Sequence, residues 1–185
     1  MPSARYDLRY LESALEVCEE YLKSPELYWA MSVAPPDGEP PYPRLTIGNV
    51  LLALQRLQRP LTPEEAAELD ALARQVAECQ QKYRALVESK AEKEAQMRAR
   101  LWAQYIDELA REEAAKAYYR TEVRNRVILE LLQQAAPLSE AVHTLRTHAD
   151  RRLQARFEPG PFVWEEELEP AFPPQPFWYL YGRPK

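Results

Sequence analysis

Glu140 and His143 lie three residues apart in a segment whose apolar spacing is typical of a helix. That spacing places a carboxylate and an imidazole on one helical face, as in one half of a di-iron helical bundle. A di-iron site needs the motif twice, but the other histidine, His148, has a leucine three residues before it. The sequence therefore predicts a surface Glu–His pair, no metal site and no cofactor.

Two cysteines, Cys18 and Cys79, each occupy an apolar position of a helical seam. Two are too few for a disulfide scaffold or a four-cysteine zinc site. A nucleophilic cysteine would need a neighbouring base and a partly exposed, electropositive setting. We expect both thiols to be buried as small apolar groups. They could meet if the first helix packs on the central one, although a disulfide is not expected in the cytoplasm.

The charge balance argues against a general nucleic-acid binder. The chain has 29 acidic and 24 basic residues, a formal net charge of −5, and this field repels phosphate. One helical face near the C-terminus is nevertheless basic, and an acidic stretch at 165–169 follows it. We expect that stretch or the solvent to neutralise the face, and keep phosphate or nucleic-acid contact as the alternative. The contact residues would then be Arg146, Arg151, Arg152 and Arg156.

A smaller group of arginines lies beside aromatic residues. Arginine next to aromatic rings can stack nucleic-acid bases, but we expect these side chains to form a polar rim between helices. With four glycines the chain has no glycine-rich nucleotide loop, and it shows no catalytic triad. The sequence therefore predicts a protein that is not an enzyme. The arginines of this group are Arg120, Arg124 and Arg126, and the neighbouring rings are Tyr118 and Tyr119.

The elements that position these residues are predicted to be helices, which makes the fold class all-α. The longest is a central helix over 61–136, where no glycine or proline interrupts residues 64–136. Thr62 and Glu65 form a capping box that starts it. Acid-first pairs four residues apart, such as Glu94–Arg98 and Glu122–Arg126, support it. The apolar stripe weakens near 88–96, so a hairpin broken there is the alternative, but without a turn residue we favour one continuous helix.

Shorter helices flank this central segment in one structural domain. Residues 1–60 are predicted to hold N-terminal helices with a stiff Pro-rich linker at 34–44. A C-terminal helix is predicted at 137–156. Together they can cover about half of the central stripe, so we expect an elongated bundle or coiled coil with another chain on the remainder.

An aromatic, Pro-rich extension is predicted at 157–185. Eight of its 29 residues are aromatic, which is too many for a disordered tail. Either it wraps the protein's own helices, or it docks on a partner, because aromatic side chains are common anchors at interfaces. The predicted partner anchors are Phe162, Trp164, Phe172, Phe177, Trp178 and Tyr181.

These patterns favour a non-enzymatic helical interaction or assembly protein, a structural or adaptor subunit of a larger complex. We expect self-association or a protein partner on the long helix. A nucleic-acid-associated accessory protein that uses the basic face around 146–156 is the alternative. The first residues lack the apolar run of a signal peptide, and no stretch reaches the ~20 apolar residues of a membrane span. We therefore expect a cytoplasmic protein, and the Arg-rich, Asn-poor usage favours a bacterial source.

Overall fold

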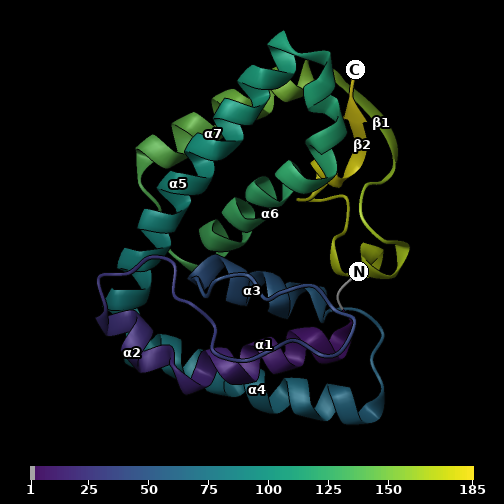
Figure 1. The fold of residues 1–185 in the computed structure, drawn as a ribbon. Coiled ribbons are helices and arrows are strands. Elements are labelled where there is room, and N and C mark those ends of the chain that lie inside the picture. The colour runs from purple at the N-terminus through teal and green to yellow at the C-terminus, as the bar shows by residue number, and fades with distance from the viewer. Residues whose placement is uncertain (1–2) are drawn as a thin grey trace.

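The computed structural model describes residues 3–185 and is mostly helical, with a small antiparallel sheet near the C-terminus (Figure 1). The all-α prediction is therefore confirmed in its main point. The α-helices are α1 (Ala4–Glu16), α2 (Cys18–Lys23), α3 (Ile47–Arg56), α4 (Pro63–Lys82), α5 (Arg84–Arg111), α6 (Tyr119–Ala135) and α7 (Glu140–Gln154). The 3₁₀ helices are η1 (Glu113–Tyr118), η2 (Glu166–Ala171) and η3 (Trp178–Leu180), and the strands are β1 (Phe157–Phe162) and β2 (Tyr181–Pro184).

The predicted helix start at Thr62 is confirmed, and α3 begins with a similar cap at Thr46. The Thr46 hydroxyl accepts a hydrogen bond from the backbone N–H of Asn49 at 3.0 Å. At α4 the capping box is complete, since the Glu65 N–H donates to Thr62 Oγ1 (3.2 Å) and the Thr62 N–H donates to Glu65 Oε2 (3.0 Å). Each cap satisfies backbone donors that the first helical turn leaves free.

The continuous central helix is wrong, and so is a break near 88–96. Tyr83 leaves helical geometry and separates α4 from α5, while the chain reverses at residues 112–118. The reversal lets α6 pack beside α5. Its physical cause is burial, because every residue of α6 from 125 to 132 is buried and the helix therefore needs cover on several sides. The alanine-rich part of α5 stays helical, with Ala91, Ala95 and Ala99 fully buried.

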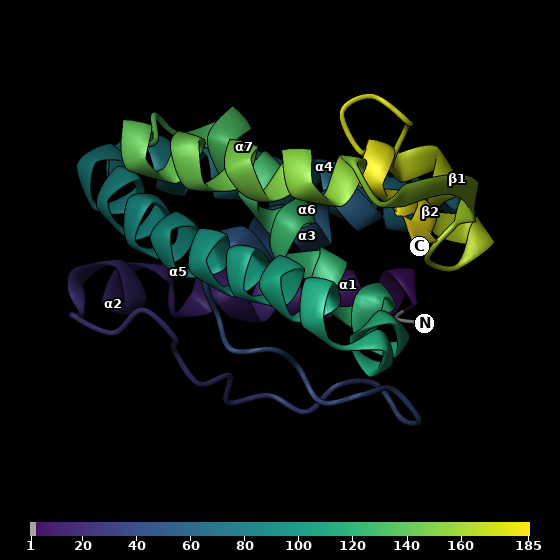
Figure 2. The ribbon, with the colours of Figure 1, turned by 90° about the horizontal axis from the view of Figure 1, so that it is seen from above.

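The helices form two groups that share α3. In Figure 1, α1, α3 and α4 gather at one end of the molecule, and α5, α6 and α7 lie towards the other. Figure 2 shows α7 running alongside α5 from a second direction, and the two helices are in contact. Helix α3 packs on α1 on one side and on α5 and α6 on the other. It therefore connects the two apolar clusters of the chain.

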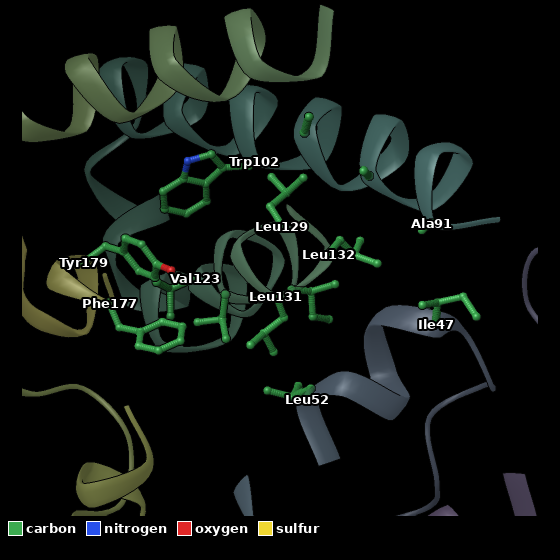
Figure 3. Packing of buried hydrophobic residues seen from close by; sticks show 14 of the residues in the cluster. Ile47, Leu52, Ala91, Trp102, Val123, Leu129, Leu131, Leu132, Phe177 and Tyr179 are labelled. Carbon is green, nitrogen blue, oxygen red and sulfur yellow. The ribbon is translucent and has the colours of Figure 1, made fainter. Parts of the chain in front are cut away.

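The larger cluster is centred on α6. Val123, Leu129 and Leu132 of α6 are fully buried, and Figure 3 shows them among Trp102 of α5 and Tyr179 of the extension. The Trp102 indole N–H donates to Asp150 Oδ1 of α7 at 3.0 Å, so its polar atom is satisfied. The extension thus completes the core on the side of α6 that the helices leave open.

Cys18 and Cys79 are joined in a disulfide that links α2 to α4. The prediction of two separate thiols is therefore wrong. The sequence allowed the two cysteines to meet if the first helical segment packed near residue 79, and this packing brings the two apolar positions together. The Pro-rich linker is also anchored, because the ring of Tyr42 packs on those of Tyr6 (4.6 Å between centroids) and Tyr10 (5.5 Å).

Candidate functional site

The aromatic extension packs on its own chain. Phe172 and Phe177 are buried, and Phe162, Trp164, Trp178 and Tyr181 are half-buried. The Trp164 indole N–H donates to the carbonyl oxygen of Arg120 at 3.0 Å, and the Tyr181 hydroxyl donates to that of Phe172 at 2.8 Å. These six residues therefore contact their own chain, which is the first of the two arrangements considered for the extension.

The predicted basic face is partly neutralised, but by other acids than expected. Arg146 lies 3.6 Å from Glu130, and Arg152 pairs with Asp107. Within the acidic stretch, Glu165 forms an ion pair with Arg120 at 2.7 Å and not with the basic face. Within residues 3–185, Arg151 and Arg156 form no ion pair, and both are exposed. Two of the four arginines thus remain available to an external anion.

Glu140 and His143 both lie in the first turns of α7. Glu140 is exposed and His143 is half-buried. Across the described part of the chain, no group of three or more His, Cys, Asp or Glu residues is placed to hold a metal ion. No described helix is long and apolar enough to cross a membrane.

A surface patch on α5 and η1 holds most of the large apolar side chains that the described chain exposes. Tyr118 is 65% exposed, and Met97 and Leu101 are each 38% exposed. Leu101 and Tyr118 line a hollow of about 230 Å³ together with Glu108 and Glu122. We call Met97, Leu101, Glu108, Tyr118 and Glu122 the α5–η1 patch.

The two carboxylates of the α5–η1 patch have only neutral hydrogen-bond partners. Glu108 accepts from the Gln104 side-chain amide at 3.0 Å, and Glu122 accepts from that of Asn125 at 3.2 Å. Neither forms an ion pair within the described residues. The predicted pair between Glu122 and Arg126 is absent, because Arg126 binds Asp150 instead (2.9 Å).

Negative charge therefore accumulates at this hollow. Tyr105 also lines the hollow, and its phenol donates to the carbonyl oxygen of Ala115 at 3.1 Å. Burial raises the pKa of Tyr105, and the carboxylates of Glu122 and Glu108 raise it further. The hollow combines the exposed apolar side chains of Leu101 and Tyr118 with two carboxylates that form no ion pair among the described residues. Such a site favours a cationic group carried on an apolar segment.

Sequence reasoning missed this patch. In the sequence, Leu101 stands next to Trp102 in the apolar stripe that resumes after 88–96, and Tyr118 is a ring beside the arginines of the expected polar rim. The sequence does carry one indication of the patch. Residues 101 and 102 are adjacent on a helix and cannot face the same neighbour, so one of the two must lie away from the core that buries the other. Comparisons with known protein families, with characterised proteins and with solved structures find no match to this chain.

Proposed function

We propose that the chain is a non-enzymatic helical interaction protein that binds a partner through the α5–η1 patch. The observation that carries this proposal is the pairing of exposed Leu101 and Tyr118 with two carboxylates that lack a cation. The partner segment would present an apolar side chain next to an arginine or a lysine. Tyrosine at the centre of a contact is a frequent source of binding energy.

The surrounding structure supports a preformed binding surface. Tyr105, which lines the hollow, and Ala115 are both buried and are joined by a hydrogen bond, so the reversal between α5 and η1 is held in place. A surface that is ordered before binding loses little conformational entropy on association. The two acids would contribute mainly to the rate of association and to the choice of partner.

The nucleic-acid alternative has weaker support. It would rest on Arg151 and Arg156, because Arg146 and Arg152 already have carboxylate partners. Two exposed arginines on a chain of net charge −5 release few counterions from a phosphate backbone. We therefore place protein binding first.

The proposal is tested by site-specific photo-crosslinking with the full chain in its native host. A photoreactive phenylalanine replaces Tyr118, and the same residue replaces exposed Arg151 as the matched control. We expect an adduct from position 118 that position 151 does not give, with the crosslink on a partner peptide that contains arginine or lysine.

A second variant checks the chemistry of the patch. Leu101→Asp adds a third acid to the hollow and removes apolar surface, so it should reduce the adduct from position 118 at least fivefold. Equal adduct yields from positions 118 and 151 would overturn the proposal. An adduct with a second copy of this chain would show that the patch mediates self-association and does not bind a different protein.

A further inference from the structure

A second hollow, of about 160 Å³, lies between α3, α6 and η2. Three guanidinium groups line it, from Arg56 of α3 and from Arg120 and Arg124 of α6. Trp164, Leu52 and Leu168 form the apolar part of its wall, and the exposed Thr121 and the carboxylate-bearing Glu165 also line it. We call these eight residues the arginine cavity. Figure 1 shows the extension passing close to α3 and α6 in this region.

Two of the three arginines have carboxylate partners. Arg56 donates from Nε to Asp7 Oδ2 at 3.0 Å, and Asp7 is fully buried. Arg120 pairs with Glu165 at 2.7 Å, and its side chain is 55% exposed. The Arg56 pair is fixed by burial, whereas Arg120 at the mouth can turn towards a ligand.

Arg124 has no carboxylate partner among residues 3–185. Its Nη2 donates to the neutral side-chain oxygen of Asn49 at 2.7 Å. Its Nε is buried and has no hydrogen-bond partner. A buried guanidinium N–H without an acceptor carries a free-energy cost, because the group has lost its hydration and gained no hydrogen bond in exchange.

The electrostatic surroundings of Arg124 increase this cost. Burial lowers the pKa of Arg124, and the charges of Arg56 and Arg98 lower it further, to about 10. Asp7 and Glu165 compensate Arg56 and Arg120, so Arg124 is the guanidinium of the cavity that a bound anion would neutralise.

We propose that the arginine cavity binds the phosphoryl group of a small molecule. A carboxylate would be fully occupied by one bidentate arginine, whereas a phosphoryl group offers oxygens to several guanidinium groups and to the Thr121 hydroxyl. Arg124 binds the oxyanion, Arg120 closes over it from the mouth, and Trp164 and Leu52 contact the apolar part of an ester. This site is separate from the α5–η1 patch and does not depend on the function proposed for it.

Binding is tested with the full chain by isothermal titration and thermal unfolding at constant ionic strength. The probes are inorganic phosphate, phenyl phosphate and benzoate, with chloride as the reference salt. We expect saturable binding of both phosphates and a rise in melting temperature. Benzoate should bind at least tenfold more weakly than phenyl phosphate. Tighter binding of phenyl phosphate than of inorganic phosphate identifies an ester as the ligand class, and the reverse identifies free phosphate.

Two variants locate the site. Arg124→Met should raise or maintain the melting temperature without phosphate and weaken phosphate binding at least tenfold. Arg120→Gln, at the exposed mouth, should leave the fold intact and weaken binding several-fold, which keeps the test valid if Arg124→Met does not fold. Arg151→Gln is the matched control, because it removes an exposed arginine outside the cavity.

Three results would overturn the proposal. One is that phosphate stabilises the protein no more than chloride does. Another is that Arg151→Gln weakens binding as much as the two cavity variants. The third is that Arg124→Met lowers the melting temperature while phosphate binding stays unchanged. Arg124 would then serve only the stability of the fold, through its hydrogen bond to Asn49.

Discussion

At the scale of single residues, one carboxylate holds three helices together. Glu94 of α5 is fully buried and accepts hydrogen bonds from Thr46 Oγ1 and the Gly48 N–H, both at 2.7 Å. Arg98 donates to the same carboxylate at 3.1 Å and to Asn125 of α6 at 2.9 Å. A negative charge at the N-terminus of α3 is favourable, because the free N–H groups of the first turn point towards it.

Gly48 should not tolerate a side chain. A Cβ at this position would lie 2.3 Å from Ile128 Cγ2 and 2.7 Å from Glu94 Oε1. Gly48→Ala should therefore destabilise the protein by about 2 to 3 kcal/mol through overpacking. Urea unfolding followed by circular dichroism measures this. Gly160→Ala is the control, since its Cβ would meet its nearest neighbour at an ordinary 3.5 Å. Equal urea midpoints for the two variants would contradict the packing described here.

The sequence predicted part of this arrangement. Glu94 and Arg98 are four residues apart in a helical segment, so their pairing follows from local spacing. Their burial does not, because it depends on α3, which lies more than 40 residues earlier in the chain. The same limit explains Arg126, whose acidic partner Asp150 is on another helix. Local spacing predicts which ions can pair, and the tertiary fold decides which of them do.

At the scale of elements, the reversal at 112–118 was not predictable from turn residues. Glu112 adopts an extended conformation without any glycine or proline beside it. The reversal is held by tertiary contacts, including that of the Tyr105 hydroxyl with Ala115. By contrast, the start of α4 followed from its capping box alone. The start of a helix could be predicted where local side chains cap it. The end of α5 could not, because it depends on how α5 and α6 pack together in the tertiary fold.

The disulfide between α2 and α4 should make stability depend on reductant. Cys18 and Cys79 are 61 residues apart, and closing a loop of that length restricts the unfolded chain. Reduction should therefore destabilise the protein by about 2 to 4 kcal/mol. Thermal unfolding with and without a phosphine reductant measures the effect. Cys18→Ala/Cys79→Ala should match the reduced wild type and be insensitive to the reductant. If the untreated protein titrates with two free thiols, the linkage is refuted.

At the scale of the whole molecule, the C-terminal extension acts as part of the core. Tyr119 of α6 donates a hydrogen bond to the carbonyl oxygen of Tyr179 at 2.6 Å, and both residues are buried. The composition of residues 157–185 predicted that the rings need cover. It could not say whether α6 or a partner provides it, because both would bury the same side chains.

Phe172→Ala separates those two possibilities. The ring is fully buried against Trp164 (5.1 Å between centroids) and Phe177 (5.2 Å). Its loss should cost the isolated chain about 3 to 5 kcal/mol, whereas Leu86→Ala, at an exposed position of α5, should cost under ~0.5 kcal/mol. Chemical denaturation of the purified protein decides this. Unchanged stability together with the loss of a complex would instead make the ring a partner anchor.

Buried phenols should set the alkaline limit of the fold. Burial raises the pKa of Tyr10, Tyr21, Tyr119 and Tyr179 above the ordinary value of 10. Because the folded chain holds these protons more tightly than the unfolded chain, their contribution to stability is complete below pH 10. It is lost as the pH rises through the folded-state pKa values.

The free energy of unfolding should therefore begin to fall above pH 10, and the protein should then unfold cooperatively. Absorbance at 295 nm reports tyrosinate, and far-ultraviolet circular dichroism reports helix, in the same titration. We expect the buried phenols to ionise together with the loss of helix, and Tyr10→Phe should remove one residue's absorbance from that step. Ionisation of all 11 tyrosines near pH 10 with the helices intact would contradict the burial of these rings. The two groups of helices share α3 and one continuous packing, so both signals should change in a single transition.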